Sequence, residues 1–301
     1  MKILINGING FVGRHAAALF AARGHSVCGA DLHDSSPLPV TYRTLDVTRP
    51  AEIEAALSDF RPDAVLHLSG IAFVPDAWRD PRLTFEVNAI SPLSLLAAVS
   101  RTVPSARVLF VSSAEVYGPA PGAPVSETSP LRPANLYAAS KAAADTSARI
   151  FADHLGLDLV IARPANHIGP GQSPAFVSSA FATRLRAIAA GAPPVLSVGN
   201  LDSTRDFLDV RDVVLAYALL LEKSAPGGTY TIASGRPVPI RALLETLCSI
   251  AGVSPEIRID PAYFRPTSLA PLFDTALLRA AIPWSPAIPL QTTLADLYAS
   301  L

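Results

Sequence analysis

The sequence is poor in charge, in lysine and in cysteine. Of its 301 residues only 16% are charged while 50% are hydrophobic, and the formal net charge is −1. Such an apolar, weakly charged chain is not intrinsically disordered. Its near-neutral net charge argues against a nucleic-acid binder, which would need an excess of basic residues. Two cysteines, Cys28 and Cys248, cannot form the disulfide framework of a small secreted protein, and we expect both thiols to be reduced and buried.

Long apolar runs are also missing. No segment reaches 18 uninterrupted apolar residues, and the apolar run at the N-terminus is too short for a signal peptide because it enters a glycine turn at Gly7. We therefore expect a soluble, cytoplasmic protein with no membrane contact. Its length suits one large domain, or one domain with an additional lobe.

Short apolar runs alternate with amphipathic helical stretches in the first half of the chain. This alternation predicts an α/β fold in which a doubly wound parallel sheet is covered by helices on both faces. The expected strands are residues 2–6, 26–31, 40–45, 64–68, 108–112 and 159–163, and the expected helices are residues 12–23, 51–57, 82–101 and 138–155.

After Pro164 the regular alternation of strands and helices ends, and glycine and proline cluster. We predict that residues 1–164, with 204–235 returning to them, form the main domain. Residues 165–203 and 236–301 then form a smaller C-terminal lobe that binds the substrate.

A glycine-rich turn follows the first expected strand. Gly7, Gly10 and Gly13 have the spacing G-x-x-G-x-x-G and open an expected helix. Glycines there let the backbone approach a pyrophosphate, and the helix N-terminus supplies N–H donors. Three glycines could also merely make a tight turn. The acid Asp31, at the end of the second strand, favours the dinucleotide site, because a carboxylate there accepts hydrogen bonds from ribose hydroxyls.

The pattern therefore predicts a Rossmann-type NAD(P) site. The Asp31 carboxylate would repel a 2′-phosphate, so NAD(H) is favoured while NADP(H) remains possible. Asp46 could flank the adenine or instead cap a helix, and His67 is better explained as a core histidine than as a ligand. The residues expected to contact the cofactor are Gly7, Asn9, Gly10, Phe11, Val12, Asp31, Leu32, Asp46, Val47, Leu68, Ser69, Gly70, Asn88, Ser112, Tyr137, Lys141 and Pro164.

Lysine is rare enough for its positions to be informative. The chain has only Lys2, Lys141 and Lys223, and Lys141 follows Tyr137 by four residues on an expected helix. The two side chains would share one helix face. An ammonium group near a phenol, together with the positive nicotinamide ring, lowers the phenol pKa toward the range needed for acid–base catalysis. A chance pairing on an amphipathic helix is the alternative.

A hydroxyl at the end of a parallel strand would complete the site. Ser112-Ser113-x-x-Val116-Tyr117-Gly118 provides it, and with Tyr137-x-x-x-Lys141, the glycine turn and Arg205-Asp206-Phe207 the chain resembles the extended short-chain dehydrogenase/reductase family. The resemblance implies that Ser113, Tyr137 and Lys141 are catalytic. Ser113 would bind the substrate oxygen, Tyr137 would be the general acid–base, and Lys141 would hold the ribose.

The sequence after Ser113 narrows the reaction. Dehydratases of this family carry an Asp-Glu pair there, whereas this chain has Ala114-Glu115, which argues against dehydration. Arg163-Pro164-Ala165-Asn166 and the segment around Asn200 resemble GDP-4-keto-6-deoxy-D-mannose reductases. The residues that the resemblance places at the substrate are Ser113, Glu115, Tyr137, Asn166, Val177, Arg184, Asn200, Arg205 and Arg265. Thr267-Ser268 stands where those reductases have an acid for the nucleoside ribose.

We therefore predict an oxidoreductase that reduces the C4 ketone of a nucleotide-linked 4-keto-6-deoxy sugar. A nucleotide-sugar 4-epimerase with tightly bound NAD is the first alternative, and a catalytically silent dinucleotide-binding protein is a distant one. No metal site is expected. The helices around Asn88 and Tyr137 are apolar over most of their circumference, and by the resemblance they would form the four-helix interface of a homodimer.

Overall fold

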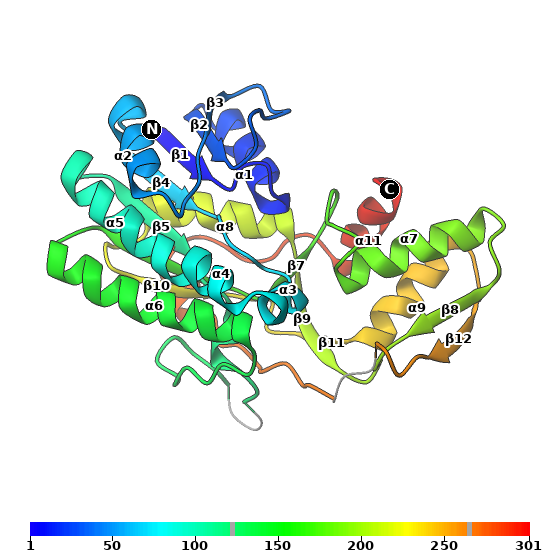
Figure 1. Cartoon of the computed structure of the whole chain (residues 1–301). Coiled ribbons are helices and arrows are strands. Elements are labelled where there is room, and N and C mark those ends of the chain that lie inside the picture. The colour runs from blue at the N-terminus through cyan, green and yellow to red at the C-terminus, as the bar shows by residue number, and fades with distance from the viewer. Residues whose placement is uncertain (121–123, 264–266) are drawn as a thin grey trace.

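The computed structural model describes residues 1–120, 124–263 and 267–301. Its centre is a parallel seven-stranded sheet with the order β10-β6-β5-β4-β1-β2-β3, which confirms the predicted fold class (Figure 1). The strands are β1 (Lys2–Asn6), β2 (Ser26–Asp31), β3 (Thr41–Thr44), β4 (Ala64–His67), β5 (Arg107–Val111), β6 (Leu159–Pro164) and β10 (Thr229–Ile232).

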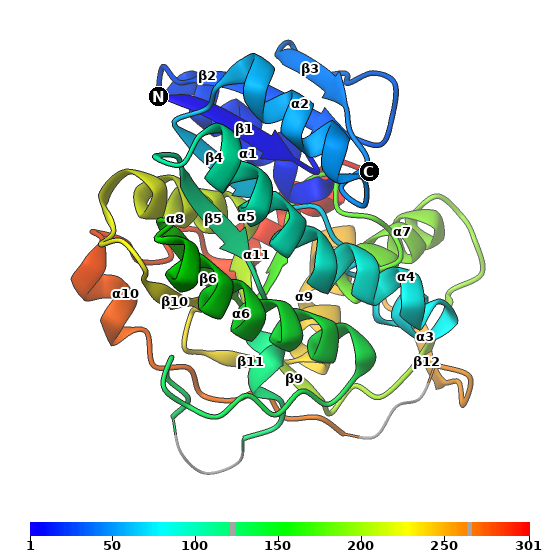
Figure 2. The same cartoon turned by 60° about the vertical axis from the view of Figure 1, so that its left-hand side comes forward.

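Helices cover both faces of this sheet. On one face α1 (Phe11–Ala22) packs against α8 (Val210–Lys223), and their apolar side chains form one core with β1 and β10. On the other face α2 (Pro50–Phe60), α5 (Ser91–Thr102) and α6 (Leu136–Leu155) lie side by side, as Figure 2 shows. The central strands are apolar on both faces because helices bury both.

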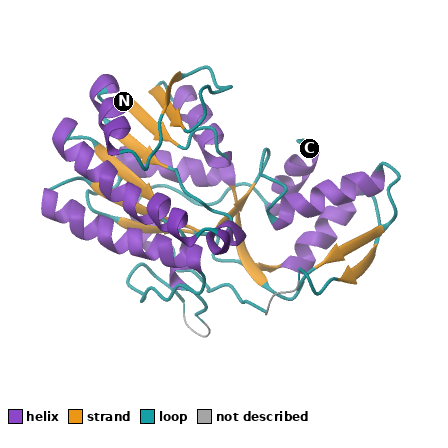
Figure 3. Ribbon diagram, in the orientation of Figure 1, coloured by secondary structure: helices purple, strands orange, loops and turns teal. Residues whose placement is uncertain are grey.

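The C-terminal lobe has its own helices and two small sheets (Figure 3). Its helices α7 (Val177–Ala189), α9 (Ile240–Ala251) and α11 (Leu290–Ala299) enclose a separate apolar core. Its strands are β8 (Val195–Val198) with β12 (Glu256–Ile259), and β7 (Asn166–Ile168) and β11 (Pro237–Pro239) on either side of β9 (Thr204–Asp209). The segment 204–235 was predicted to return to the main domain, but its first strand β9 pairs with these lobe strands and its Phe207 packs in the lobe core.

Part of the segment expected in the lobe packs elsewhere. Helix α10 (Ala276–Ala281) contacts β10, and Leu278, Ile282 and Trp284 join the core of the main sheet. The indole Nε1 of Trp284 donates to the carbonyl oxygen of Asp212 at 2.8 Å. The chain therefore passes between the two parts more often than the predicted division assumed.

The expected helix over residues 82–101 is interrupted. After α3 (Val74–Arg79), the chain forms α4 (Pro81–Phe85), a π-helical turn η1 (Glu86–Ile90) and then α5. By length and composition the run Pro81–Thr102 could cross a membrane. Half of it is buried inside the fold, and the core helix of a soluble protein passes the same test of length and composition. The π-turn contains Asn88, and such turns are frequent at functional sites.

Both cysteines have free thiols. The expected burial is confirmed for Cys28 and is wrong for Cys248, which is half-buried at the edge of the lobe core because its helix α9 faces solvent there.

Candidate active site

The predicted cofactor residues lie at the carboxyl ends of neighbouring parallel strands. The glycine turn follows β1, Asp31 ends β2, Ser69 follows β4, and Ser113 follows β5. Ligands of open α/β sheets bind at this edge, where the loops after the strands diverge. The fold thus brings these segments together although they are far apart in the sequence.

The glycine turn forms a cradle that side chains would fill. Gly7 has a φ of +76°, and a Cβ on it would lie 2.9 Å from the backbone nitrogen of Ser69. A Cβ on Gly13 would lie 2.4 Å from the carbonyl oxygen of Gly7. The N-cap residue of α1 is Gly10, so no side chain caps this helix, and its first turn contains no acidic residue. The N–H groups of Gly7, Asn9 and Gly10 already have hydrogen-bond acceptors within the fold. The N–H groups of the first turn of α1 are therefore the ones available to a pyrophosphate, and the cradle fits the predicted dinucleotide.

Asp31 has a structural role as well. Its Oδ2 accepts the backbone N–H of Asn9 at 3.0 Å, and its Oδ1 accepts that of Leu32 at 2.8 Å. The carboxylate thereby fixes the glycine turn against the end of β2. Each oxygen has a second lone pair for a ribose hydroxyl.

Asp46 forms a local turn before α2 but does not cap that helix, whose N-cap residue is Arg49 and has no side-chain cap. Its Oδ1 accepts hydrogen bonds from the backbone N–H and the hydroxyl of Thr48, just before α2. Val47, beside it, is buried in the core under α2. Neither observation places an adenine there.

Asn6 connects the first strand to the loop after β4. Its Oδ1 accepts the backbone N–H groups of Leu68 at 3.0 Å and Ser69 at 3.4 Å, and its Nδ2 contacts Nδ1 of His67 at 2.7 Å. The amide therefore positions the Leu68–Ser69 backbone against the glycine turn.

A chain of hydrogen bonds runs from the next loop to the helix that carries Tyr137. Asn88 Oδ1 accepts the backbone N–H of Ile71 at 2.8 Å, and its Nδ2 donates to Oγ of Ser140 at 2.9 Å. Ser140 in turn donates to the carbonyl oxygen of Tyr137 at 2.7 Å. Asn88 and Ser140 are both buried, so this chain fixes the first turn of α6.

The start of α6 is also tied to the serine loop. Asn135 caps the helix by accepting the backbone N–H of Ala138 at 2.8 Å, and its Nδ2 donates to Oε2 of Glu115 at 3.1 Å. Ser113 accepts the N–H of Glu115 at 3.1 Å at the start of the 3₁₀ turn η2 (Ala114–Tyr117). The Ser113 hydroxyl lies close enough to the Tyr137 phenol to lower its pKa.

The pKa of Tyr137 is raised in the free protein. Burial is the main cause, the nearby Glu115 carboxylate adds to it, and the hydrogen bond from Ser113 opposes both. In the protein without cofactor, burial of the phenolate therefore outweighs any lowering of the Tyr137 pKa, and the lowering expected from Lys141 together with the nicotinamide ring stays a prediction. A neutral phenol is the form that can donate a proton to a carbonyl oxygen.

Lys141 is buried beneath the site. Its Nζ donates to the carbonyl oxygen of Val111 at 2.9 Å and lies 5.3 Å from the centre of the Phe110 ring. Burial lowers the pKa of Lys141 to about 8, and the Asp145 carboxylate opposes this. The ammonium form therefore predominates at neutral pH.

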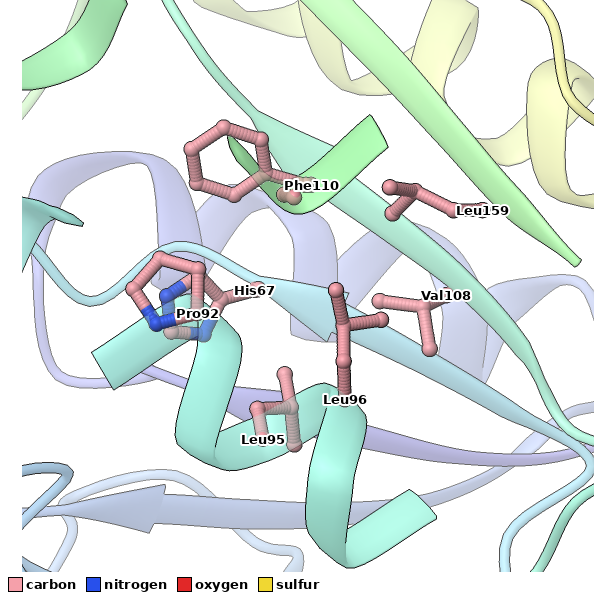
Figure 4. Close-up of a pocket in the computed structure, with 8 residues that line it drawn as sticks. His67, Pro92, Leu95, Leu96, Val108, Phe110 and Leu159 are labelled. Atoms are coloured by element: carbon pink, nitrogen blue, oxygen red, sulfur yellow. The ribbon is translucent and has the colours of Figure 1, made fainter. Parts of the chain in front are cut away.

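His67 is a core residue, as the sequence favoured. It lines a small void with Pro92, Leu95 and Phe110 that leaves no room for water (Figure 4), and its Nε2 has no partner among the described residues. Burial and the charge of Lys141 lower the pKa of His67 to about 3. The imidazole is therefore neutral and adds no charge beside Lys141.

The predicted substrate residues of the lobe are spread over several elements. Asn166 is in β7, Val177 begins α7, Arg205 is in β9, and Asn200 donates to the hydroxyl of Thr267 at 2.9 Å. Arg184 stacks on the ring of Tyr263 at 5.3 Å. Arg265 lies outside the described residues, and Pro164 ends β6 beside the site.

Several residues that organise the site were not among the predicted site residues: Asn135, Ser140, Asp145 and Arg163. Asn135 had a local signal, because an asparagine three residues before a helical amide is a typical cap. The roles of the other three depend on contacts between distant segments, which spacing along the chain does not show.

Comparison with known proteins agrees with this geometry. Residues 3–233 match the model of the NAD dependent epimerase/dehydratase family. The chain belongs to this family. It is 36% identical to a GDP-6-deoxy-D-mannose reductase of Pseudomonas aeruginosa over 97% of this chain and 94% of that protein.

Solved structures support the family fold over the whole length. The Pseudomonas aeruginosa protein RMD, solved with NADPH, has a TM-score of 0.85 at 34% identity, covering 99% of this chain and 98% of its own. A Thermus thermophilus UDP-glucose 4-epimerase with NAD has a TM-score of 0.88 at 30% identity, covering 100% and 98%. This member of the family is an NAD(P)-dependent enzyme.

The close approach of Gly70 to Lys141 gives a testable consequence. A Cβ on Gly70 would lie 3.1 Å from Oδ1 of Asn88 and 3.3 Å from Nζ of Lys141. We expect Gly70→Ala to displace both groups and to lower kcat/KM for the cofactor by about tenfold. Steady-state kinetics would show this, with Ser249→Ala, on the exposed face of α9 in the lobe, as the control. An unchanged kcat/KM would mean that the loop has more room than the structure shows.

Proposed function

We propose that this enzyme reduces the C4 ketone of a nucleotide-linked 4-keto-6-deoxy sugar of the GDP-4-keto-6-deoxy-D-mannose type. The observation that carries the proposal is the arrangement of Ser113, a neutral Tyr137 and a buried Lys141 beside the glycine cradle. The 36% identity to a GDP-6-deoxy-D-mannose reductase supports the substrate class.

The side chains divide the reaction between them. Ser113 donates a hydrogen bond to the ketone oxygen, and Tyr137 transfers its phenolic proton to that oxygen as the C–O double bond becomes a single bond. When bound, reduced NAD(P) supplies the hydride that C4 accepts. Lys141 supplies a fixed positive charge that stabilises the tyrosinate left after proton transfer. The dehydratase route is disfavoured because Ala114, buried at the site, offers no carboxylate.

The experiment is a stoichiometric assay with the purified enzyme. GDP-4-keto-6-deoxy-D-mannose and NADH or NADPH should give one oxidised cofactor per sugar reduced. Competition by GDP, UDP, CDP and dTDP would identify the base, and GDP should compete best. Strong competition by another nucleotide alone would overturn the guanine assignment and leave the reductase chemistry standing.

A 4-epimerase is the second candidate, and the similarity to the Thermus thermophilus UDP-glucose 4-epimerase favours it. An epimerase retains tightly held NAD and consumes no cofactor over a full turnover. Net oxidation of NADH with a keto sugar therefore separates the two activities.

Asp31 supports a preference for NADH, because its carboxylate would repel a 2′-phosphate. We expect Asp31→Asn to improve NADPH relative to NADH by about tenfold in kcat/KM, since it removes the charge and keeps the size. The measurement is the ratio of kcat/KM values for the two cofactors, with Asp34→Asn as the control on the same loop. A ratio unchanged in Asp31→Asn would contradict the assigned preference.

We also propose a cytoplasmic homodimer that associates through α5 and α6. Leu93, Ser147, Ile150, Phe151 and His154 line a groove of about 460 Å³ on these helices. The side chain of Ile150 is 65% exposed there. Ile150 and the partly buried Leu93 and Phe151 form an apolar surface across two neighbouring helices, which is typical of an interaction surface.

A charge on this surface should dissociate the dimer. We expect Ile150→Glu to convert the protein to monomers because the carboxylate would be buried without a partner. Sedimentation velocity measures the change, and Ile259→Glu, on the exposed strand β12, is the matched control. A wild-type protein that sediments as a monomer would contradict the proposal.

A further inference from the structure

Helix α6 is attached to the sheet by two polar contacts one helical turn apart. Lys141 donates to the carbonyl oxygen of Val111 at the end of β5. Asp145 accepts two hydrogen bonds from Arg163 on β6, from Nε at 2.8 Å and from Nη2 at 2.7 Å. Val111 pairs with Ala162, the residue before Arg163, so the two contacts reach adjacent points of neighbouring strands.

Arg163 also holds the segments that flank the serine. Its Nη1 donates to the hydroxyl of Tyr117 at 2.8 Å and to the carbonyl oxygen of Glu127 at 3.1 Å. Tyr117 ends the η2 turn that begins after Ser113. A single buried guanidinium therefore connects the turn after Ser113 with the helix that carries Tyr137 and Lys141.

The charged and titratable groups around Lys141 are few. Asp145 and Tyr137 share its helix, and neutral His67 faces it from β4. Arg163 lies beyond Asp145 on β6, and Glu115 lies beside Tyr137 on η2. From the π-turn and the loop after β4, Asn88 and Gly70 contribute no charge. Asp145 is thus the carboxylate that favours the ammonium form.

We propose that Asp145 and Arg163 are a positioning pair that keeps Lys141 charged and fixes α6, and with it Tyr137, relative to Ser113. This inference rests on the proposed function for its catalytic meaning. It also makes a claim about the free protein that is independent of any substrate. A pair that merely stabilised the fold would affect unfolding and leave the titration of Lys141 unchanged.

The scarcity of lysine makes a direct test practical. With lysine labelled with ¹³C at Cε, NMR would show three signals, of which exposed Lys2 and Lys223 serve as internal references. In the wild type the Lys141 signal should titrate near pH 8, where burial places its pKa. In Asp145→Asn we expect its midpoint to fall by about one pH unit, because the opposing carboxylate is lost.

Controls separate this effect from a general loss of structure. Asp153→Asn, which removes an exposed acid from the same helix, should leave the Lys141 midpoint unchanged. If Asp145→Asn does not fold, Asp145→Asn combined with Arg163→Gln removes both buried charges and leaves no unpaired ion. It too should lower the midpoint, whereas Asp145→Glu should restore it.

The activity readout is separate from the titration. In Asp145→Asn the alkaline limb of kcat/KM should move down by the same amount as the Lys141 midpoint. A Lys141 midpoint equal to that of the wild type, in either folded variant, would overturn the positioning role. A lowered midpoint in a protein without keto-sugar reductase activity would support the positioning role and contradict only the proposed function.

Discussion

Replacing Tyr137 with phenylalanine should lower kcat by about 10²–10⁴-fold, the range that a positioned general acid contributes. The substitution removes one oxygen, the proton donor, and keeps the ring in its place beside Ser113. Because the glycine cradle and the contacts of Asn88 and Lys141 do not involve this oxygen, the affinity for NADH should change by less than about threefold. Single-turnover assays with the keto sugar and fluorescence titration with NADH measure the two effects.

The control for this variant is Tyr298→Phe, on α11 of the lobe. It should have wild-type kcat. A Tyr137→Phe enzyme that retained most of its turnover would show that another group donates the proton, and the assignment of the general acid would be wrong.

Replacement of Lys141 should have the second largest effect. We expect Lys141→Met to lower kcat by about 100-fold, because the tyrosinate that forms during proton transfer loses its neighbouring charge. Lys141→Arg should lower kcat by nearly as much. Its bulky guanidinium cannot occupy the space that the ammonium fills, 3.3 Å from the position of a Cβ on Gly70.

The pH dependence supplies an independent check on this role. Burial lowers the pKa of Lys141 to about 8, so the ammonium loses its proton as the pH rises through that value. In the wild type kcat/KM should therefore fall above about pH 8, since this parameter reports the ionisation of the free enzyme. In Lys141→Met this fall of kcat/KM above about pH 8 should be absent. If the fall remained in the variant, another group would be the one that ionises.

Much of the fold could be predicted because its signals are local. Apolar runs such as residues 2–6 and 159–163 are typical of buried parallel strands, and the glycine turn marks where the first strand meets its helix. The π-turn around Asn88 was not predicted, because the spacing of apolar residues does not distinguish a regular α-helix from an α-helix that contains a π-helical turn. The return of Trp284 to the main core depends on a hydrogen bond to Asp212, 72 residues away.

Part of the candidate site could also be proposed from local sequence signals. Tyr137 and Lys141 are one turn apart, and the sequence alone shows that they share a helix face. The pKa of Tyr137 was not predictable, because it depends on burial and on Glu115, which approaches through the cap at Asn135. The Asp145–Arg163 pair joins a helix to a strand, and only the assembled sheet reveals it.

The central claim is hydride transfer to a sugar ketone with Tyr137 as the acid. The most direct measurement is NMR of the product formed from GDP-4-keto-6-deoxy-D-mannose and NADH carrying deuterium at the transferable position. Hydride transfer to the ketone should leave one deuterium bound to C4 for each NADH consumed. The claim would be contradicted if the sugar were converted without gaining deuterium at C4, or if the sugar were not reduced while NADH was still present.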